Sequence, residues 1–482
     1  MLEHLKNEFN QTYTENGAKA YKSTESYVLD LFSMGGVYRN REDEEVCQLF
    51  SKAFSENPLL AMKTLFNLRD VRGGQGERRF FKVVLKYLSL HHKDSLKKNL
   101  HLIPKYGRWD DMWVLLETNL KHDVLKIVRE QLHNDVKSEN PSLLGKWMPS
   151  LNASSKETKK YAKILQQGLG GTPKQYRKLL TNLRGKINIV ESNLSSKNYD
   201  DINYNKLPSK ASLIYRNAFL KNDESRYREY LEGLASGETT VNAGAIYPYE
   251  IAREGLSWRK VLSEEDIKLL DAQWNSLPNF IGDNHDNSLA VVDTSGSMTG
   301  TPMEVAISLG IYLSERNKGQ FKDYFMTFSS DPQLQKVVGE DIIQKIRNLS
   351  HADWGMSTNI EKVFTKILDT AVKNNVSQEE MIKKVIIISD MEFNYCTNVN
   401  EFLFDALREM YEEHGYELPN LTFWNVDARN NSTQFKMNDV GVELVSGFSP
   451  SLFKNVLGSI NKTPYELMLE VINDERYDDI TV

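Results

Sequence analysis

Two apolar runs of strand length lead directly into oxygen-bearing side chains. The first run enters Asp293-Thr-Ser295-Gly-Ser297, which presents one carboxylate and two serine hydroxyls at spacings of two. The second run, Val-Ile-Ile-Ile-Ser, enters Asp390, and Thr358 adds a hydroxyl on a loop that precedes a helical pattern. Oxygen atoms of carboxylates and hydroxyls are the ligands that Mg²⁺ and other hard cations prefer. These residues therefore predict a divalent-cation site, with Mg²⁺ as the expected ion.

The same side chains have other interpretations. Asp293 and Ser295 could simply cap the helix that follows, but this would leave Asp390, at the end of the second run, without a role. A phosphatase that forms an aspartyl phosphate needs a second Asp two positions after the first, where Ser295 stands. An acyl-transfer nucleophile needs the Gly-x-Ser-x-Gly turn, which neither Ser295 nor Ser297 has. The pattern favours binding over catalysis, and we expect the protein not to be an enzyme.

A Gly-rich segment, Arg72-Gly-Gly-Gln-Gly-Glu-Arg78, could contact phosphate. It lacks the Lys-Ser/Thr of a P-loop and follows a helical pattern instead of a strand. We therefore expect a turn between helices, with a phosphate contact through Arg72, Arg78 or Arg79 as the alternative. His351 and Asp353 are expected to pack in their loop and not to perform acid–base work.

The candidate ligands lie where strand-length apolar runs alternate with helical patterns. This alternation predicts a parallel sheet covered by helices on both faces, an α/β Rossmann-type domain whose carboxyl edge would collect the ligands. A helix over residues 304–316 is expected to begin with a capping box formed by Thr301 and Glu304, and Thr463 and Glu466 repeat the device. The expected strands cover residues 289–292, 324–328, 385–388, 421–426 and 442–445.

The first 280 residues show short amphipathic helical patterns and no alternation of period two. In residues 80–90 the polar positions form one narrow stripe, which predicts a helix that is buried on most sides. Packed short helices without a strict repeat period indicate an all-α, HEAT-like solenoid, curved array or ring. The expected domains are an α-helical domain at 1–280, the α/β domain at 281–455, and a C-terminal helix within 456–482 that packs back on the body.

Charge is distributed unevenly along the 482 residues. Residues 1–280 hold 43 Lys and Arg against 35 Asp and Glu, whereas residues 281–482 hold 17 against 31. Residues 141–190 contain ten basic residues and one acidic residue, together with three aromatic residues, Trp147, Tyr161 and Tyr176. Such a patch could bind polyanions, or it could consist of solvated helix faces that balance the acidic domain.

The remaining composition excludes several classes of protein. Cys47 and Cys396 are far apart and belong to no metal-binding or redox cluster, so neither a disulfide framework nor a zinc site is indicated. The N-terminal segment lacks the apolar run of a signal peptide, and no uninterrupted apolar stretch reaches the roughly 18 residues of a membrane span. We expect a cytoplasmic protein without membrane contact.

The arrangement of strand ends and hydroxyls resembles the metal-ion-dependent adhesion site of the von Willebrand A family. The resemblance implies Ser295 and Ser297 as direct ligands and Thr358 as a direct or water-bridged ligand. It implies Asp293 and Asp390 as outer carboxylates that hold coordinated waters. In that family the open position of the metal typically accepts a carboxylate from a partner protein.

The whole chain also resembles a domain-of-unknown-function family found in plants, fungi and viruses. The segments that carry this resemblance are residues 67–77, 103–111, 176–180, 207–209 and 247–250. A helical part followed by an A-type domain is in turn similar in architecture to the Ro autoantigen (TROVE) family, whose helical ring binds small or misfolded RNA. Within this chain, residues 176–187 most resemble the basic lining of that ring.

Two functions are therefore expected, and they belong to different classes. The first is RNA binding, because Lys and Arg neutralise phosphates and aromatic side chains stack on unpaired bases. The second is a protein-interaction scaffold, in which the cation captures a carboxylate of a protein partner and the helices bind no RNA. The residues expected to bind RNA are Lys156, Lys159, Lys160, Lys163, Lys174, Arg177, Lys178, Arg184 and Lys186.

Overall fold

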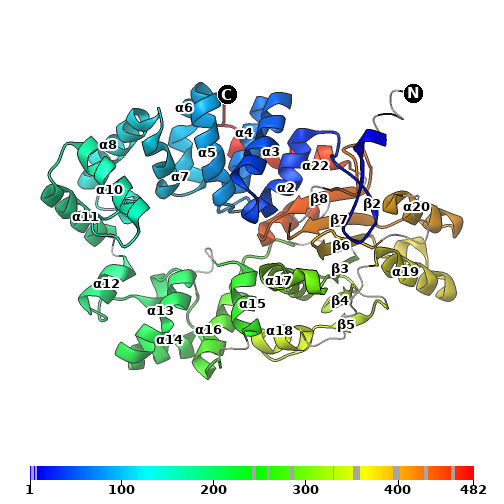
Figure 1. The fold of residues 1–482 in the computed structure, drawn as a ribbon. Helices are drawn as coiled ribbons and strands as arrows, with labels where there is room; N and C mark the ends of the chain where they lie inside the picture. The colour runs from blue at the N-terminus through cyan, green and yellow to red at the C-terminus, as the bar shows by residue number, and fades with distance from the viewer. Residues whose placement is uncertain are drawn as a thin grey trace.

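In the computed structural model of the chain, a long arc of helices begins and ends at an α/β domain (Figure 1). The arc leaves the sheet beside strand β8, turns at α10 and α11, and returns to helices α17 and α18. The residues that the structure describes are 1, 5, 8–187, 189–241, 246–257, 261–282, 287–328, 331–350, 359–394, 402–427, 432–457 and 462–482, without the side chains of Leu403 and Asn455.

The α/β domain contains a six-stranded sheet in the order β5-β4-β3-β6-β7-β8. All neighbouring strands are parallel except β5, which pairs antiparallel with β4 at the edge. The sequence did not indicate β5, because it is short and largely exposed and so has no buried apolar run. The strands are β3 (Ser288–Val292), β4 (Tyr324–Thr327), β5 (Leu334–Lys336), β6 (Lys384–Ser389), β7 (Asn420–Asn425) and β8 (Val442–Ser446).

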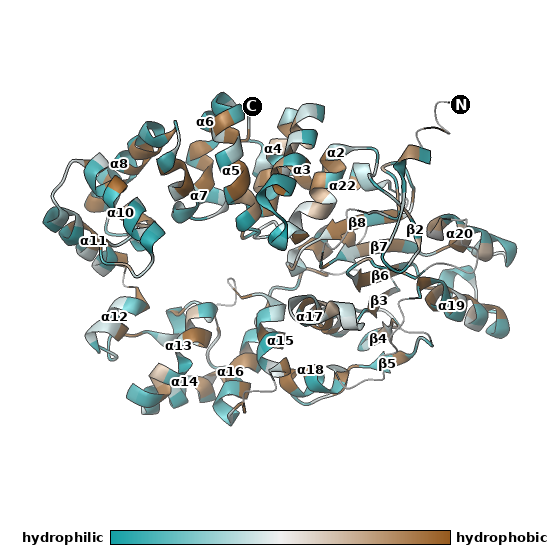
Figure 2. Cartoon of the chain, in the orientation of Figure 1, coloured by the Kyte–Doolittle hydropathy of each residue, from teal (hydrophilic) through white to brown (hydrophobic). Residues whose placement is uncertain are grey.

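Helices cover both faces of this sheet, as the alternating pattern predicted. Helices α17 (Thr301–Arg316) and α18 (Ile342–Ser350) share one apolar core with Ala290 and Val292 of β3. Helices α19 (Ile360–Asn374) and α20 (Leu403–Glu413) contribute to a second core on the opposite face. Between these layers β6 is fully buried and β7 is buried except at Asn420, and Figure 2 shows both strands as hydrophobic segments.

The two expected capping boxes have different outcomes. At α22 (Pro464–Ile472), the Thr463 side chain accepts from the backbone N–H of Glu466, and Glu466 caps in return, so this box is confirmed. At α17 the prediction was wrong, because the N-cap is Gly300. Thr301 and Glu304 instead bind the guanidinium of Arg253, so tertiary contacts replace the local cap.

Helices dominate residues 1–284, which confirms the predicted helical part. One exception is a hairpin of β1 (Gln11–Tyr13) and β2 (Lys19–Tyr21), two strands too short to show a periodic pattern. Residues Trp109–Glu117 form the 3₁₀ helix η3. The α-helices are α2 (Tyr27–Met34), α3 (Asp43–Glu56), α4 (Pro58–Arg69), α5 (Arg79–His91), α6 (Lys93–Asn99), α7 (Ile103–Tyr106), α8 (Lys121–Lys137), α9 (Leu144–Trp147), α10 (Lys156–Leu169), α11 (Pro173–Ile187), α12 (Val190–Ser196), α13 (Ser209–Asn222), α14 (Glu224–Ser236), α15 (Pro248–Leu256) and α16 (Glu264–Asn275).

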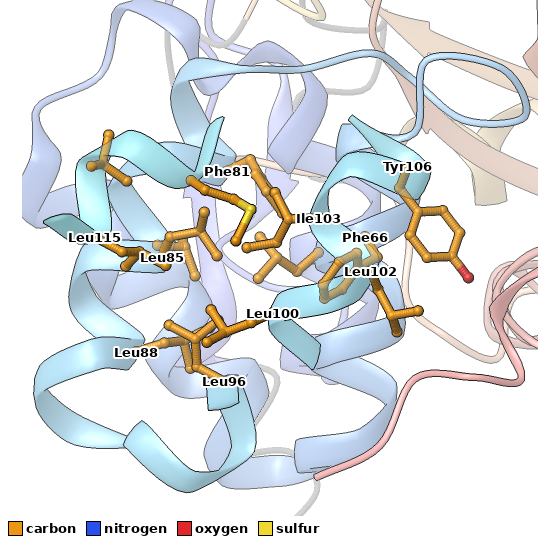
Figure 3. Packing of buried hydrophobic residues seen from close by; sticks show 14 of the residues in the cluster. Phe66, Phe81, Leu85, Leu88, Leu96, Leu100, Leu102, Ile103, Tyr106 and Leu115 are labelled. Atoms are coloured by element: carbon orange, nitrogen blue, oxygen red, sulfur yellow. The ribbon is translucent and has the colours of Figure 1, made fainter. Parts of the chain in front are cut away.

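The helical part contains more than one apolar core. The first core extends from α2 to α11, and Figure 3 shows its packing around Phe66, Phe81 and Leu85. The C-terminal tail belongs to this core, because Met468 and Tyr477 are buried in it. A separate core joins α12, α13 and α14, and α15 packs with the α/β domain.

The Gly-rich segment forms a turn that holds distant parts of the chain together. A Cβ atom on Gly74 would lie 1.9 Å from the carbonyl oxygen of Asn67, so only glycine fits there. The Gly74 carbonyl accepts a hydrogen bond from Ser451 of the α/β domain, and Asp70 binds Arg476 of the tail. The segment is thus a turn with structural contacts, as its sequence predicted. Among the described residues, no helix is both long and apolar enough to traverse a bilayer.

Candidate functional site at the carboxyl edge of the sheet

The candidate ligands Asp293, Ser295 and Ser297 follow strand β3, and Asp390 follows the neighbouring strand β6. β3 and β6 are paired in parallel along their whole length, so their carboxyl ends lie at the same edge of the sheet. The ladder continues one residue farther, because the backbone N–H of Asp293 donates to the carbonyl of Ile388. Asp293 after β3 and Asp390 after β6 are therefore delivered side by side, although 97 residues separate them in the sequence.

Asp293 is fully buried and is held from two directions. Its Oδ1 accepts from the backbone N–H of Ser295 at 2.9 Å, and its Oδ2 accepts from Oγ of Ser389 at 2.6 Å. No Lys or Arg forms an ion pair with Asp293 in the described part of the chain. Burial, with a further contribution from the nearby Asp390 carboxylate, raises the pKa of Asp293 to about 6.

The two serine hydroxyls lie next to each other. Oγ of Ser295 and Oγ of Ser297 form a hydrogen bond with each other and are 2.8 Å apart. Adjacent ligands of an octahedral Mg²⁺ ion, each at roughly 2.05 Å from the metal, would be about 2.9 Å apart. The hydroxyl pair therefore has the spacing of two neighbouring ligands of one ion. Ser295 is buried and Ser297 is partly exposed, so the pair lies at the boundary between the sheet and the solvent.

Asp390 begins a tight turn after β6. Its carboxylate accepts from the backbone N–H of Glu392 at 3.2 Å, and Ser389 accepts from the N–H of Met391. Met391 has a left-handed backbone, with φ at 65°, which is uncommon for a residue other than glycine. Such strain persists only where the surrounding contacts enforce it, and it is frequent at binding sites. Asp390 and Glu392 are both buried.

The structure disfavours the interpretation that these residues only cap a helix. Ser295 precedes the short 3₁₀ helix η6 (Gly296–Met298), but its side chain makes no capping hydrogen bond to it. The N-cap of helix α17 is Gly300, so neither Asp293 nor Ser295 caps that helix. Asp293 binds the N–H of Ser295 and the hydroxyl of Ser389, so it links two strand ends.

The arrangement brings Asp293, Ser295 and Ser297 together, with Asp390 on the adjacent strand end. Thr358 lies outside the described residues, as do His351 and Asp353. The bridging role of Ser389 was not predicted, and its only signal in the sequence is its position before Asp390. No group of three His, Cys, Asp or Glu side chains suited to a metal occurs within the described residues, so a cation here would depend on hydroxyl and water ligands as well as carboxylates.

The residues predicted to bind RNA lie on α10 and α11, and they fall into two sets. Three of them have structural partners: Lys160 pairs with Glu117, Arg184 donates to the carbonyls of Gly145 and Met148, and Lys186 donates to carbonyls at the end of α8. The other six are exposed, and the described structure gives their side chains no hydrogen bond or ion pair; they are Lys156, Lys159, Lys163, Lys174, Arg177 and Lys178.

Of the three aromatic residues in this region, two are too deeply buried to stack on bases. Tyr161 and Tyr176 are buried in the first core, and Tyr176 donates to the carbonyl of Pro149. Trp147 is partly exposed, with the guanidinium of Arg108 4.7 Å from its ring centroid. Two of the three phosphate contacts considered for the Gly-rich segment lose support, because Arg78 pairs with Asp110 and Asp111 and Arg79 pairs with Asp43. The third residue, Arg72, is exposed.

Comparison with known proteins identifies two family models along the chain. The model described as "Domain of unknown function (DUF2828)" matches residues 14–140 and 152–284, and "Domain of unknown function (DUF7788)" matches residues 287–479. The chain is 31% identical to "Uncharacterized protein L728" of Acanthamoeba polyphaga mimivirus over 506 aligned residues, which cover 96% of this chain and 87% of that protein. These matches confirm the resemblance to a domain-of-unknown-function family with viral members. They assign no von Willebrand A or TROVE domain. The chain therefore belongs to the DUF2828 family, with a DUF7788 domain forming its α/β part.

Proposed function

We propose that this protein is a non-enzymatic binding protein whose α/β domain, of the von Willebrand A type, holds one divalent cation, most simply Mg²⁺. The observation that carries the proposal is the fully buried Asp293 carboxylate, which has no basic partner in the described structure and lies beside two hydroxyls with ligand spacing. An isolated buried carboxylate is costly unless a cation or hydrogen bonds compensate it.

The donor set suits a hard cation. Ser295 and Ser297 would be direct ligands, and Asp293 and Asp390 would hold the ion directly or through water. Thr358 is proposed as a further ligand on the basis of its sequence position alone. This set leaves a coordination position for an external oxygen, so the bound ion would accept a carboxylate from an acidic partner protein. The carboxylates of Asp293 and Asp390 lie at the same edge of the sheet, because both follow paired parallel strands.

The cation proposal is tested by isothermal titration of the full chain with MgCl₂. We expect one binding site, which Asp293→Asn or Asp390→Asn removes and Asp369→Asn leaves intact. Asp369 is an exposed carboxylate on α19 of the same domain, so it controls for the change in charge. Unchanged Mg²⁺ binding in Asp293→Asn would disprove the proposed site.

A second function, RNA binding by α10 and α11, is supported by the spacing of the unpaired basic side chains. On α10, Lys159 lies three residues after Lys156, and Lys163 lies four residues after Lys159. On α11, Arg177 and Lys178 lie three and four residues after Lys174. Residues at such spacings share one face of a helix. Each helix therefore presents a basic stripe, which is the kind of surface that the sequence resemblance to the Ro family implies.

Filter binding with single-stranded and with structured RNA tests this second function. Arg177→Glu combined with Lys178→Glu should weaken binding at least tenfold, and the wild-type affinity should fall steeply with salt, since each neutralised phosphate contributes a slope of about −0.7 in log K against log salt for single strands. Lys362→Glu combined with Lys373→Glu, two exposed lysines on α19, makes the same change of charge outside the stripes. Equal affinity in both double variants, or no RNA binding at low salt, would disprove RNA binding by the stripes.

The two functions are separable. In the scaffold alternative the cation captures the partner and the helices bind no RNA, so Asp293→Ala would abolish capture of an acidic protein partner and the charge reversals on α11 would change nothing. If RNA binding is the function of the helices, Asp293→Ala would leave it unchanged.

A further inference from the structure

The N-terminal hairpin lies against the edge of the sheet that carries the candidate cation site. Figure 1 shows the hairpin (dark blue) beside the strands of the α/β domain, far in sequence from everything it contacts there. Ala18 at its turn end is buried in the core between the sheet, α19 and α20. The α/β domain thus includes a piece of chain that precedes the whole helical arc.

One side of the hairpin holds the segment that follows Asp390. Oγ1 of Thr14 donates to the carbonyl of Phe393 at 2.7 Å, and the backbone N–H of Glu15 donates to the Glu392 carboxylate at 2.7 Å. Nδ2 of Asn16 donates to the carbonyl of Glu392 at 2.5 Å. Three consecutive hairpin residues therefore hold two consecutive residues of the loop.

The other side of the hairpin is anchored to the connection between β7 and β8. Tyr21 and Thr433 exchange two backbone hydrogen bonds, of 2.8 and 2.9 Å. The Tyr21 ring stacks on Phe402 with centroids 4.1 Å apart. The backbone N–H of Met437 donates to the carbonyl of Thr24. The backbone hydrogen bonds to Thr433 and Met437 fix the position of the hairpin independently of the Glu392–Phe393 segment, whereas Phe402 belongs to the same β6–α20 connection as that segment.

The hydrogen bonds continue from the hairpin to the site. Glu392, which the hairpin holds through both its carboxylate and its carbonyl, donates its backbone N–H to the Asp390 carboxylate. Met391 between them has a left-handed backbone, so the turn needs outside contacts to keep its shape. Groups that hydrogen-bond a metal ligand set its orientation and its affinity for the ion.

We propose that the N-terminal hairpin is a positioning element of the cation site: Thr14, Glu15 and Asn16 hold the Glu392–Phe393 segment, and this segment aims the Asp390 carboxylate at the ion. The inference rests on the proposed cation-binding function. It predicts that side chains near residue 14 control the Mg²⁺ affinity of a site whose residues lie more than 270 positions later in the chain.

The test uses the full chain with isosteric and conservative variants of Thr14. Thr14→Val keeps the shape of the buried side chain but removes the hydroxyl, which donates to Phe393 and also accepts from the backbone N–H of Ala18 within the hairpin; Thr14→Ser keeps the hydroxyl and both bonds. Isothermal titration with MgCl₂ should show a dissociation constant roughly tenfold higher in Thr14→Val and near the wild-type value in Thr14→Ser, since loss of such outer contacts typically costs 10- to 100-fold in metal affinity. Asn16→Ala changes an exposed side chain, which leaves the core untouched, and should weaken Mg²⁺ binding in the same direction.

Amide hydrogen exchange provides a second readout. In Thr14→Val without Mg²⁺, the amides of residues 391–393 should exchange faster, and those of β3 and β6 should be unchanged. Wild-type Mg²⁺ affinity in both Thr14→Val and Asn16→Ala would overturn the inference and leave the proposed function standing. Absence of Mg²⁺ binding in the wild-type chain would overturn the proposed function, and the inference with it.

Discussion

Replacing Asp293 by Asn is expected to change the stability of the protein in opposite directions with and without Mg²⁺. Without a cation, the folded protein must bury an ionised carboxylate that has no basic partner among the described residues. Asn has nearly the same shape and carries no charge, so the metal-free variant should be more stable than the metal-free wild type. With Mg²⁺ the wild type should gain stability and the variant should not, because a ligand that binds only the folded form stabilises it.

The pKa shift of Asp293 sets the size of the effect. Burial raises this pKa from 3.8 to about 6, and one pKa unit corresponds to about 1.4 kcal/mol, so the ionised form destabilises the fold by up to about 3 kcal/mol at pH 7.5. Unfolding entropy is about 2.1 cal/mol/K per residue near 60 °C. The thermal unfolding midpoint of metal-free Asp293→Asn should therefore lie roughly 3 °C above that of the metal-free wild type if the whole chain unfolds together, and roughly 7 °C above it if the α/β domain unfolds as a unit. Mg²⁺ at 100 times its dissociation constant should add about 2.7 kcal/mol to the wild type alone.

Thermal unfolding followed by circular dichroism, in EDTA and in MgCl₂, measures both effects. Asp369→Asn serves as the control, because it removes an exposed carboxylate from the same domain. If Asp293→Asn unfolds at or below the wild-type temperature in EDTA, the buried charge does not destabilise the fold. If Mg²⁺ stabilises the variant as much as the wild type, Asp293 does not bind the ion.

Two further predictions follow from buried charges. The pKa of Asp293 is raised in the folded state, so the protonated carboxyl favours folding below about pH 3.8, and this contribution to the free energy of unfolding is lost as the pH rises through about 6. In denaturant titrations in EDTA, the stability difference between Asp293→Asn and the wild type should therefore widen from pH 5 to pH 7.5. A constant difference would contradict the raised pKa. Asp111→Asn should destabilise the helical part by about 3–5 kcal/mol, because it leaves the buried Arg69 guanidinium, 2.6 Å from the Asp111 carboxylate, without its charge partner. Asp43→Asn breaks an exposed pair with Arg79 and should change the denaturation midpoint little; an equal loss in both variants would contradict the role of burial.

The sequence predicted those parts of the fold that depend on local pattern. The central strands were recognised because each is a continuous apolar run that is buried on both faces. The capping box at Thr463 was recognised because its four residues contain all of its hydrogen bonds. The two strand-end carboxylates were predicted to meet because parallel strands align their carboxyl ends.

Where the outcome depended on a distant contact, local pattern was a poor guide. Thr301 and Glu304 have the residue types of a capping box, but Arg253 of α15 binds both. Arg184 and Lys186 carry the charge expected of RNA ligands, but they donate to backbone carbonyls of neighbouring segments. In each case a partner that local sequence cannot show determines what the side chain does.

Residue type and period are local properties, so the amino-acid sequence is enough to place side chains at the ends of the apolar strands and on the basic faces of α10 and α11. Long-range packing is needed to bring Ser389 to Asp293, to set the hairpin at residues 11–21 against the segment after Asp390, and to join the C-terminal tail to the first helical core. These contacts join segments up to several hundred residues apart, and their geometry depends on how whole layers of helices and strands pack. A sequence period or motif describes neighbouring residues only, so these long-range contacts are visible only in the folded chain.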